Sequence, residues 1–295
     1  MNETKTIIFG ASGQDGHYLI ELCKLKGMEP VGVSRSGNGV KGDVSSYKQV
    51  EHLVSEHKPA YVFHVAAKST TRHDALFENH ETISTGTLNI LEAVRKHSPG
   101  TRVFITGSGV QFENRGLPIS ENDKFEASSP YSIARIQSVY AARYYRSLGL
   151  KVYVGYLFHH ESPFRKPNHV SQMIAVAAQR IAKGVNEIIE LGDISVEKEW
   201  TFAGDIARGI FMLVEQDKVF EAAIGSGETY SIENWLEQCF RIIGKDWHDH
   251  VRLREGFTSE YKRLFSDPST MHKLGWFPSV KLPELAEMMI TASKP

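Results

Sequence analysis

The chain has 295 residues, of which 41% are hydrophobic and 23% are charged, as in a soluble globular protein with a full core. Its 34 Lys and Arg residues nearly balance its 35 Asp and Glu residues, which argues against the strong positive charge typical of proteins that bind nucleic acid or anionic membranes. It has only two cysteines, no signal-peptide pattern at its start and no run of about 18 apolar residues, so we expect a cytoplasmic protein without a membrane span.

Short β-rich segments alternate with helical segments over the first half of the chain. In order, we expect a strand at 6–9, a helix through 18–25, a strand at 31–33, a helix through 50–54, a strand at 60–65, a helix at 87–94, a strand at 102–105, a helix at 131–145, a strand at 152–157 and a helix near 171–183. Strands that are separated by helices form right-handed βαβ units and a parallel sheet. The sequence therefore predicts the α/β class. We expect a doubly wound Rossmann sheet over 1–158, a return to it at 201–227, and a smaller C-terminal lobe that makes up most of 159–295.

A glycine-rich loop, residues 10–16 (GASGQDG), lies between the first strand and the first helix. Gly10 permits a tight turn, Gly13 lets the backbone approach a pyrophosphate, and Gly16 allows close packing of helix and strand. The free N–H groups and the positive dipole end of the helix then face the anion. The loop predicts a dinucleotide cofactor held by Gly10, Ser12, Gly13, Gln14, Asp15 and Gly16.

The end of the second strand distinguishes the two nicotinamide cofactors. An acidic residue there would bond the ribose 2′-OH of NAD, but this chain has Ser34, Arg35 and Ser36. A guanidinium with neighbouring hydroxyls suits the 2′-phosphate of NADP. NADP(H) is favoured, and NAD is the alternative if Arg35 is a solvated cation. We expect the remaining cofactor contacts from Arg35, Ser36, Asp43, Val44, Ala66, Ala67 and Lys68.

A candidate catalytic group follows the fourth strand. Ser108 comes just after this strand, and Tyr131 opens the long helix one turn before Arg135, so Tyr131 and Arg135 share a helix face. A tyrosine can act as a general acid or base when a nearby cation lowers its pKa from about 10, and a serine hydroxyl can orient a substrate oxygen. The alternative is a packing role for Tyr131 and a surface charge at Arg135.

Four segments resemble the extended short-chain dehydrogenase/reductase superfamily and, within it, the GDP-mannose 4,6-dehydratases. They are 10–19 (GASGQDGHYL), 157–163 (LFHHESP), 227–231 (GETYS) and 274–276 (LGW), together with the Tyr-x-x-x-basic spacing of Tyr131 and Arg135. The resemblance covers nearly the whole chain. It implies NADP(H), in contact with Tyr131 and Arg135 as well, a nucleoside-diphosphate sugar with GDP-sugars favoured, and assembly through helices into a homodimer or homotetramer.

The resemblance also implies a substrate site in and near the C-terminal lobe. The residues it assigns there are Ser69, His159, His160, Glu161, Arg165, Val170, Lys198 and Glu260. Phe164 replaces one of two neighbouring family arginines, Lys198 replaces an arginine expected to face phosphate, and Phe257 replaces the arginine that accompanies the nucleoside-facing carboxylate. Nucleotide-sugar binding is expected, and the preference for guanine is open.

The catalytic pattern departs from that of the dehydratases. Val110 stands where they carry the Glu that moves protons during 4,6-elimination, Arg135 replaces their Lys, and Ile83 replaces a polar residue of the usual proton relay. Ser108, Tyr131 and a cation suffice for hydride exchange at C4 of a sugar, with Tyr131 as the proton donor or acceptor.

These departures favour an NADP(H)-dependent enzyme that reduces, or oxidises, C4 of a 4-keto-6-deoxyhexose nucleotide. One alternative is a 4,6-dehydratase in which Gln111, His159 or His160 replaces the missing Glu, and a related one is an epimerase. Another is an inactive paralogue that binds the cofactor or a sugar nucleotide. We expect no metal, because the His248 and His250 pair has no third ligand at ordered spacing.

Overall fold

The computed structural model describes residues 4–37 and 39–292. Its centre is a sheet of seven parallel strands. In spatial order the strands are β11 (Glu221–Ile224), β6 (Lys151–Leu157), β5 (Arg102–Ser108), β4 (Tyr61–His64), β1 (Thr4–Phe9), β2 (Met28–Ser34) and β3 (Val40–Lys41). The strand order reverses between β1 and β4, so the predicted doubly wound Rossmann sheet is confirmed. Ligands of such sheets bind outside the carboxyl ends of the strands at this reversal point.

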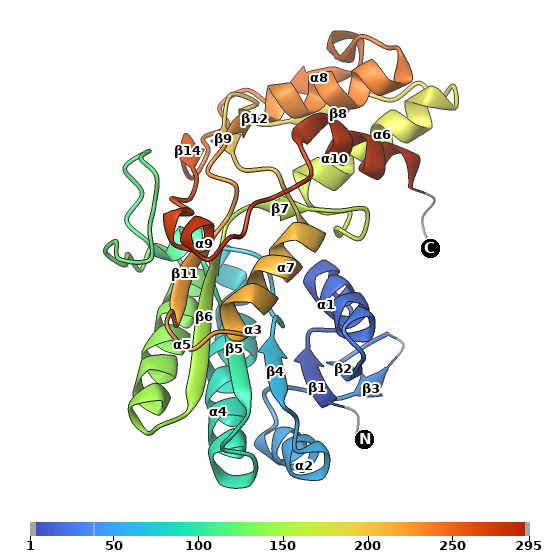
Figure 1. Cartoon of the computed structure of the whole chain (residues 1–295). Coiled ribbons are helices and arrows are strands. Elements are labelled where there is room, and N and C mark those ends of the chain that lie inside the picture. Colours follow the sequence, from blue (N-terminus) through green and yellow to red (C-terminus); the bar gives the residue numbers. More distant parts are fainter. Residues whose placement is uncertain (1–3, 38, 293–295) are drawn as a thin grey trace.

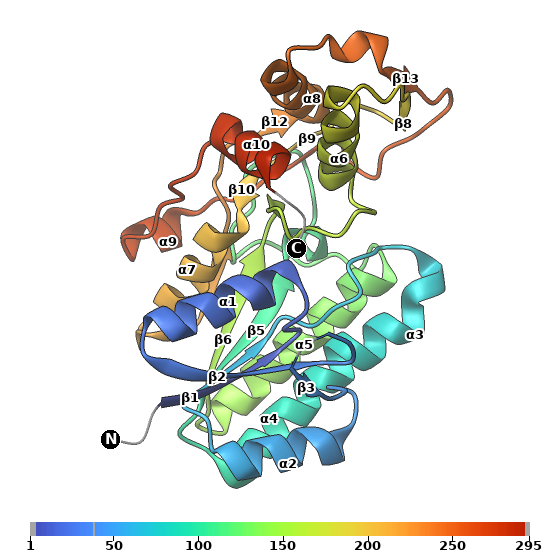
Figure 2. The same cartoon turned by 90° about the vertical axis from the view of Figure 1, so that its right-hand side faces the viewer.

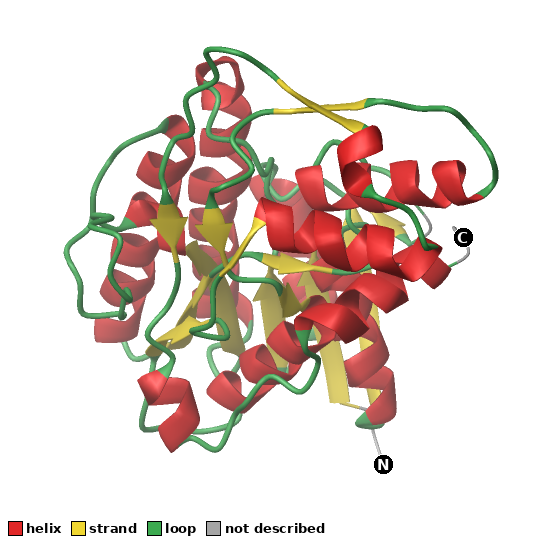
Figure 3. Ribbon diagram, turned by 90° about the horizontal axis from the view of Figure 1, so that it is seen from above, coloured by secondary structure: helices red, strands yellow, loops and turns green. Residues whose placement is uncertain are grey.

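Helices cover both faces of the sheet (Figure 2; Figure 3). One face packs against α2 (Tyr47–His57), α4 (Gly86–His97) and α5 (Pro130–Ser147), and the other against α1 (Gln14–Leu25) and α7 (Ala203–Val214). Successive side chains of a strand point to opposite faces, so Ile7 enters the first core and Ile8 the second. Burial on both faces explains why β1 is a continuous apolar run rather than an alternating one.

Above the carboxyl edge of the sheet lies a second group of helices (Figure 1). The helices α6 (Val170–Ala182), α8 (Ile232–Ile243) and α10 (Leu282–Thr291) share a separate core, in which the rings of Trp200 and Trp235 are stacked with centroids 4.7 Å apart. Short strands complete this region: β7 (His160–Glu161) with β10 (Thr201–Phe202), β8 (Ile189–Leu191) with β13 (Val251–Leu253), and β9 (Glu197–Lys198) between β12 (Tyr230–Ser231) and β14 (Arg263–Leu264). The short helix α9 (Ser269–Lys273) packs against β11.

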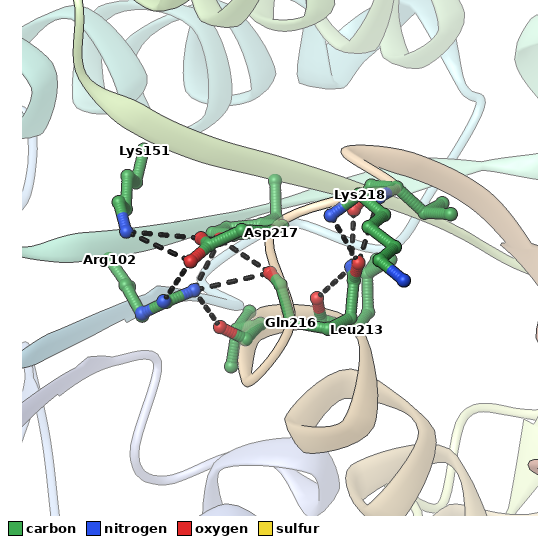
Figure 4. Close-up of polar contacts among 9 residues, drawn as sticks. Arg102, Lys151, Leu213, Gln216, Asp217 and Lys218 are labelled. Atoms are coloured by element: carbon green, nitrogen blue, oxygen red, sulfur yellow. Dashed lines mark hydrogen bonds and ion pairs between the residues drawn. The ribbon is translucent and has the colours of Figure 1, made fainter. Parts of the chain in front are cut away.

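A polar network holds the turn between α7 and β11 at the amino edge of the sheet (Figure 4). Arg102, at the start of β5, donates to the backbone oxygen of Val214 over 2.8 Å and to Asp217 over 2.9 Å. Lys151, at the start of β6, lies 3.1 Å from the same carboxylate. The network ties the last strand to the sheet at the edge opposite the ligand-binding edge.

The observed elements refine the predicted boundaries. The strand expected at 102–105 continues to Ser108, which brings this residue to the carboxyl edge. The helix expected at 87–94 begins at Gly86 and is preceded by α3 (Leu76–Asn79) and a π-helical turn at 80–85. Within the described part of the chain, no helix has both the length and the apolar character needed to cross a lipid bilayer.

Candidate active site

Two cavities meet above the carboxyl ends of β1, β4 and β5. The loop cavity is lined by the glycine-rich loop and by the segments that follow β2 and β4. The tyrosine cavity is lined by the end of β5, the start of α5 and the segment that contains β7. Val65 and Ala67 line both cavities, so a ligand can extend from one into the other.

The glycine-rich loop has the geometry of a phosphate cradle. Gly10 has φ of +98°, and a Cβ there would lie 2.6 Å from the backbone nitrogen of Ala66. A Cβ on Gly16 would lie 2.6 Å from the Cα of Ala11, whereas one on Gly13 would meet only the Gly10 oxygen, at 3.4 Å. The helix α1 begins directly after Gly13 without a side-chain cap, so the N–H groups of its first turn have no acceptor within the helix. This backbone fits the pyrophosphate of a dinucleotide.

An ion-pair group lies at the edge of the loop cavity. Arg35 lines the cavity, and its Nη2 donates to Glu78 Oε1 over 2.9 Å. Lys68 Nζ lies 3.5 Å from the other oxygen of the same carboxylate. The hydrogen bond from Arg35, with smaller contributions from the two positive charges, lowers the pKa of Glu78, although partial burial opposes the shift. Glu78 is therefore ionised at neutral pH.

The first turn of α1 is bonded to the segment at β7. Gln14 Nε2 donates to the backbone oxygen of His160 over 3.1 Å, and the Ser162 hydroxyl donates to Gln14 Oε1 over 2.9 Å. Asp15 Oδ1 lies 2.8 Å from His160 Nε2, and the Phe158 oxygen lies 2.7 Å from His160 Nδ1. Both ring nitrogens of His160 face acceptors, and this arrangement favours the doubly protonated, cationic ring.

Asp15 and His160 form a nearly buried ion pair, with exposed side-chain fractions of 22% and 10%. Burial alone raises the pKa of Asp15 and lowers that of His160. Their mutual attraction outweighs burial, so the pKa of Asp15 is lowered and the pKa of His160 is raised. A histidine that keeps its proton in this way is not available as a base.

The structure brings Tyr131, Arg135 and Ser108 to one wall of the tyrosine cavity. Arg135 is 2% exposed; its Nη2 donates to the Tyr131 hydroxyl over 3.1 Å and its Nη1 donates to the backbone oxygen of Thr106. The helix α5 begins at Pro130, and the cap residue Ser129 accepts a hydrogen bond from the Ser132 N–H. This cap fixes where Tyr131 emerges. The alternative of a surface charge at position 135 is wrong.

Ser108 and Val110 complete this wall. The N–H group of Ser108 donates a hydrogen bond to Gln111 Oε1 over 2.8 Å. The side-chain oxygen of Gln111, one of the three residues considered as a substitute base, is therefore already bonded. Val110 lines the cavity and packs against the core beneath it. A valine side chain offers no group that can move a proton.

The opposite wall carries buried charges. Lys198 is 7% exposed, and its Nζ lies 4.6 Å from the ring centroid of Trp200. Burial lowers the pKa of Lys198, and the charge of Glu161 opposes this shift. Arg165 Nε lies 3.2 Å from Glu161 Oε2. Lys198 and Arg165 carry two positive charges and Glu161 carries one negative charge, so this wall is suited to an anionic ligand.

The C-terminal segment closes the tyrosine cavity. The Tyr261 hydroxyl lies 3.0 Å from His159 Nε2, within hydrogen-bond distance, and Thr71 donates to Glu260 Oε1 over 2.5 Å. Burial, followed by the positive charge of Lys198, holds the pKa of His159 well below its ordinary value of 6.5. His159 is therefore neutral.

Most of the residues that we predicted for the site line one of the two cavities. The loop cavity receives Gly10, Ser12, Gly13, Arg35, Ser36, Asp43, Val44, Ala66 and Ala67. The tyrosine cavity receives Asp15, Ala67, Ser69, Ser108, Tyr131, Arg135, His159, His160, Glu161, Arg165, Val170, Lys198 and Glu260. Gln14, Gly16 and Lys68 line neither cavity: Gln14 is bonded to the β7 segment, Gly16 packs on Gly10 and Ala11, and Lys68 faces Glu78.

Sequence reasoning missed several residues of the site. Thr71, Lys166 and Tyr261 line the cavities and stand close in sequence to residues that were predicted. Glu78 belongs to no recognisable motif, and only the fold places it beside Arg35.

Solved structures show the same fold over nearly the whole chain. The UDP-glucose 4-epimerase of Thermus thermophilus, in complex with NAD, matches with a TM-score of 0.83 at 20% identity and covers 97% of this chain and 98% of its own. A structure of RMD from Pseudomonas aeruginosa complexed with NADPH gives a TM-score of 0.83 at 19% identity, covering 98% and 97%. These matches show the fold, a Rossmann sheet with a second group of helices above its carboxyl edge.

The particular branch follows from sequence comparison. A family model described as GDP-mannose 4,6 dehydratase matches residues 7–289, so the chain belongs to that family and the resemblance is confirmed. GDP-mannose 4,6 dehydratase 1 of Arabidopsis thaliana is 28% identical over 317 residues, which cover 96% of this chain and 88% of the relative. GDP-mannose 4,6-dehydratase of Vibrio cholerae is 26% identical and covers 97% and 92%.

Proposed function

We propose that the chain is an NADP(H)-dependent oxidoreductase that reduces C4 of a nucleotide-linked 4-keto-6-deoxyhexose, or oxidises the corresponding alcohol. The loop cavity would hold the dinucleotide through the glycine-rich loop, and Arg35 would bind the 2′-phosphate. The nicotinamide supplies or accepts a hydride when bound. The structural neighbours that are named with NAD and with NADPH support a nicotinamide cofactor in this fold.

In this proposal Tyr131 gives its hydroxyl proton to the sugar oxygen at C4 as that oxygen gains negative charge. The buried guanidinium of Arg135, 3.1 Å from the hydroxyl, stabilises the tyrosinate that remains. Ser108 orients the same sugar oxygen from the end of β5. Lys198 and Arg165 bind the diphosphate, which keeps the sugar ring next to the phenol.

The observation that carries the proposal is the absence of a proton-moving group at Val110, together with the engagement of each carboxylate that lines the tyrosine cavity. Asp15 is paired with His160, Glu161 with Arg165, and Glu260 accepts from Thr71. Hydride exchange at C4 needs one acid at the oxygen, whereas elimination needs a further base at C5. Among the described residues of this cavity, Tyr131 supplies the acid at the oxygen.

The test is a single-turnover assay with NADPH and a GDP-linked 4-keto-6-deoxyhexose. The reaction is monitored through the loss of absorbance of the reduced nicotinamide. We expect oxidation of NADPH by the unaltered protein and none above background by Tyr131→Phe, with NADPH affinity within twofold. Tyr140→Phe removes a hydroxyl from an exposed position of the same helix and should turn over normally. Turnover by Tyr131→Phe would refute the role of this phenol.

A second candidate function is 4,6-dehydration of GDP-mannose, which the names of the sequence relatives favour. His159 is the specific feature that supports it, because this neutral histidine lines the tyrosine cavity beside the Tyr261 hydroxyl, whereas Gln111 does not line that cavity and His160 is paired with Asp15. Incubation with GDP-mannose and NADP should then give a 4-keto-6-deoxy product, and His159→Asn should abolish it. If the cofactor binds and neither reaction occurs, the inactive-paralogue alternative replaces both.

We also propose that the chain forms a homodimer through α5. Ile133, Tyr140, Tyr144 and Leu148 are 40%, 59%, 60% and 49% exposed, and their spacing of 7, 4 and 4 residues places them on one helix face. A continuous stripe of large exposed apolar side chains is typical of a surface that another chain covers. A second copy is the partner that the family resemblance implies.

A further inference from the structure

Arg35 is the cation on which the proposed preference for NADP(H) depends, yet its guanidinium is already bonded. Its Nη2 donates to Glu78 over 2.9 Å, and Lys68 approaches the same carboxylate at 3.5 Å. The side chains of Arg35, Glu78 and Lys68 are 55%, 35% and 53% exposed. A small, solvated group of two cations and one anion therefore lies at the rim of the loop cavity.

Glu78 comes from α3, whereas Arg35 follows β2, so the fold brings these two residues together from separate elements. Arg35 lines the loop cavity, and Glu78 contacts Arg35 without lining that cavity itself. A guanidinium has five N–H donors, and one of them is used by Glu78. A phosphate that binds the remaining donors is held near an ionised carboxylate, so repulsion offsets part of the attraction.

We propose that Glu78 is a positioning residue that reduces the preference for NADPH over NADH, because its carboxylate competes with the adenosine 2′-phosphate for Arg35. NADH has a neutral hydroxyl at this position and meets no such competition. The proposal rests on the proposed function, since it requires the dinucleotide to occupy the loop cavity. It differs from that function by assigning selectivity to a residue outside the cavity wall.

The test compares Glu78→Gln with Glu81→Gln in the full-length protein. Glu81 is exposed in the same helical region and is not bonded to Arg35, so its replacement removes one negative charge without releasing the guanidinium. Dissociation constants for NADPH and NADH are measured by isothermal titration calorimetry at low salt. Arg35→Ala and the double variant Arg35→Ala/Glu78→Gln complete a thermodynamic cycle.

Glu78→Gln should tighten NADPH binding about three- to fivefold, the size of effect expected for a partly exposed charge pair. NADH binding should change by less than twofold, and Glu81→Gln should alter neither. In the Arg35→Ala background the effect of Glu78→Gln should disappear, and added salt should reduce it.

The inference is overturned by weaker NADPH binding by Glu78→Gln, by equal changes for both cofactors, or by an unchanged effect in the Arg35→Ala background. Loss of NADPH selectivity in Arg35→Ala without any response to Glu78→Gln would refute the role of Glu78 alone. If Arg35→Ala weakens both cofactors equally, the proposed phosphate contact of Arg35 is itself wrong. The two failures are therefore distinguishable.

Discussion

The ion pair of Asp15 and His160 joins the first turn of α1 to the β7 segment, and breaking it should destabilise the protein measurably. The two residues are 145 positions apart in the chain, and their side chains meet at 2.8 Å. We consider Asp15→Asn, His160→Asn and the double variant. An asparagine at 160 has an amide that can replace His160 Nδ1 as donor to the Phe158 oxygen, so this variant removes mainly the contact with Asp15.

The expected magnitude follows from burial. At an effective dielectric constant of about 20, two unit charges roughly 4 Å apart attract by about 4 kcal/mol. Removing one partner of a fully buried pair costs about 3–5 kcal/mol. Asp15 is 22% exposed and His160 can release its proton, so we expect each single variant to lose roughly 2–3 kcal/mol and the coupling energy to be about 2 kcal/mol.

The pH dependence has a defined sign. The pKa of His160 is raised above its ordinary value of 6.5, so its contribution is complete below pH 6.5 and is lost as the pH rises through the folded-state value. The pKa of Asp15 is lowered from 3.8, so its contribution is present above pH 3.8 and is lost as the pH falls through the folded-state value. The pair therefore stabilises the folded protein most between pH 3.8 and pH 6.5.

Chemical denaturation of the four proteins at pH 6 and pH 9 measures the coupling. We expect about 2 kcal/mol at pH 6 and a smaller value at pH 9, because the contribution of a group with a raised pKa declines as the pH rises. The same coupling at both pH values would show that the contact is a neutral hydrogen bond rather than an ion pair, and additive single effects at pH 6 would show that the contact contributes no stability.

Three further predictions concern the cavities and the α5 surface. Gly10→Ala should cost about 1–3 kcal/mol and weaken NADPH binding, because φ is +98° and the new Cβ would lie 2.6 Å from the Ala66 nitrogen; thermal denaturation and calorimetry check both effects. Lys198→Met should weaken GDP-sugar binding at least tenfold and leave NADPH affinity unchanged, and in the unaltered protein sugar-nucleotide affinity should fall as the pH rises through the lowered pKa of Lys198. Tyr144→Glu should convert the proposed dimer to monomer in light scattering at equal concentration, and an unchanged mass would place the interface elsewhere.

The sheet and the phosphate cradle were predictable because their signals are local. A buried strand such as β1 is a short apolar run, and the loop that follows it is marked by three glycines at fixed spacing. At Gly10 and Gly16 the structure supplies the steric reason for glycine, since an added Cβ would meet backbone atoms. The fold class follows from the repetition of such local units.

Other features depend on contacts between distant segments and leave no periodic signal. The strands β9, β12 and β14 have two residues each, which is too short for any alternation to be recognised. Gln14 belongs to the predicted cofactor loop, yet its side chain is bonded to a segment almost 150 residues away. Glu78 illustrates the same limit, because its contact with Arg35 exists only after the fold brings α3 within reach of the segment that follows β2.

The chain belongs to the dehydratase family, but at a small number of positions its residues differ from the catalytic pattern of the dehydratases. The framework that would hold the cofactor and the diphosphate is built from backbone geometry and buried cations. The departure that bears most directly on elimination is Val110, which packs on the core, while Tyr131 keeps its cationic neighbour. A hydride exchange and an elimination use the same binding framework, but only the elimination requires a proton to leave carbon. The proposed reduction at C4 therefore needs only the phenol that the site retains, whereas elimination would need another residue, such as His159, to take the proton from carbon.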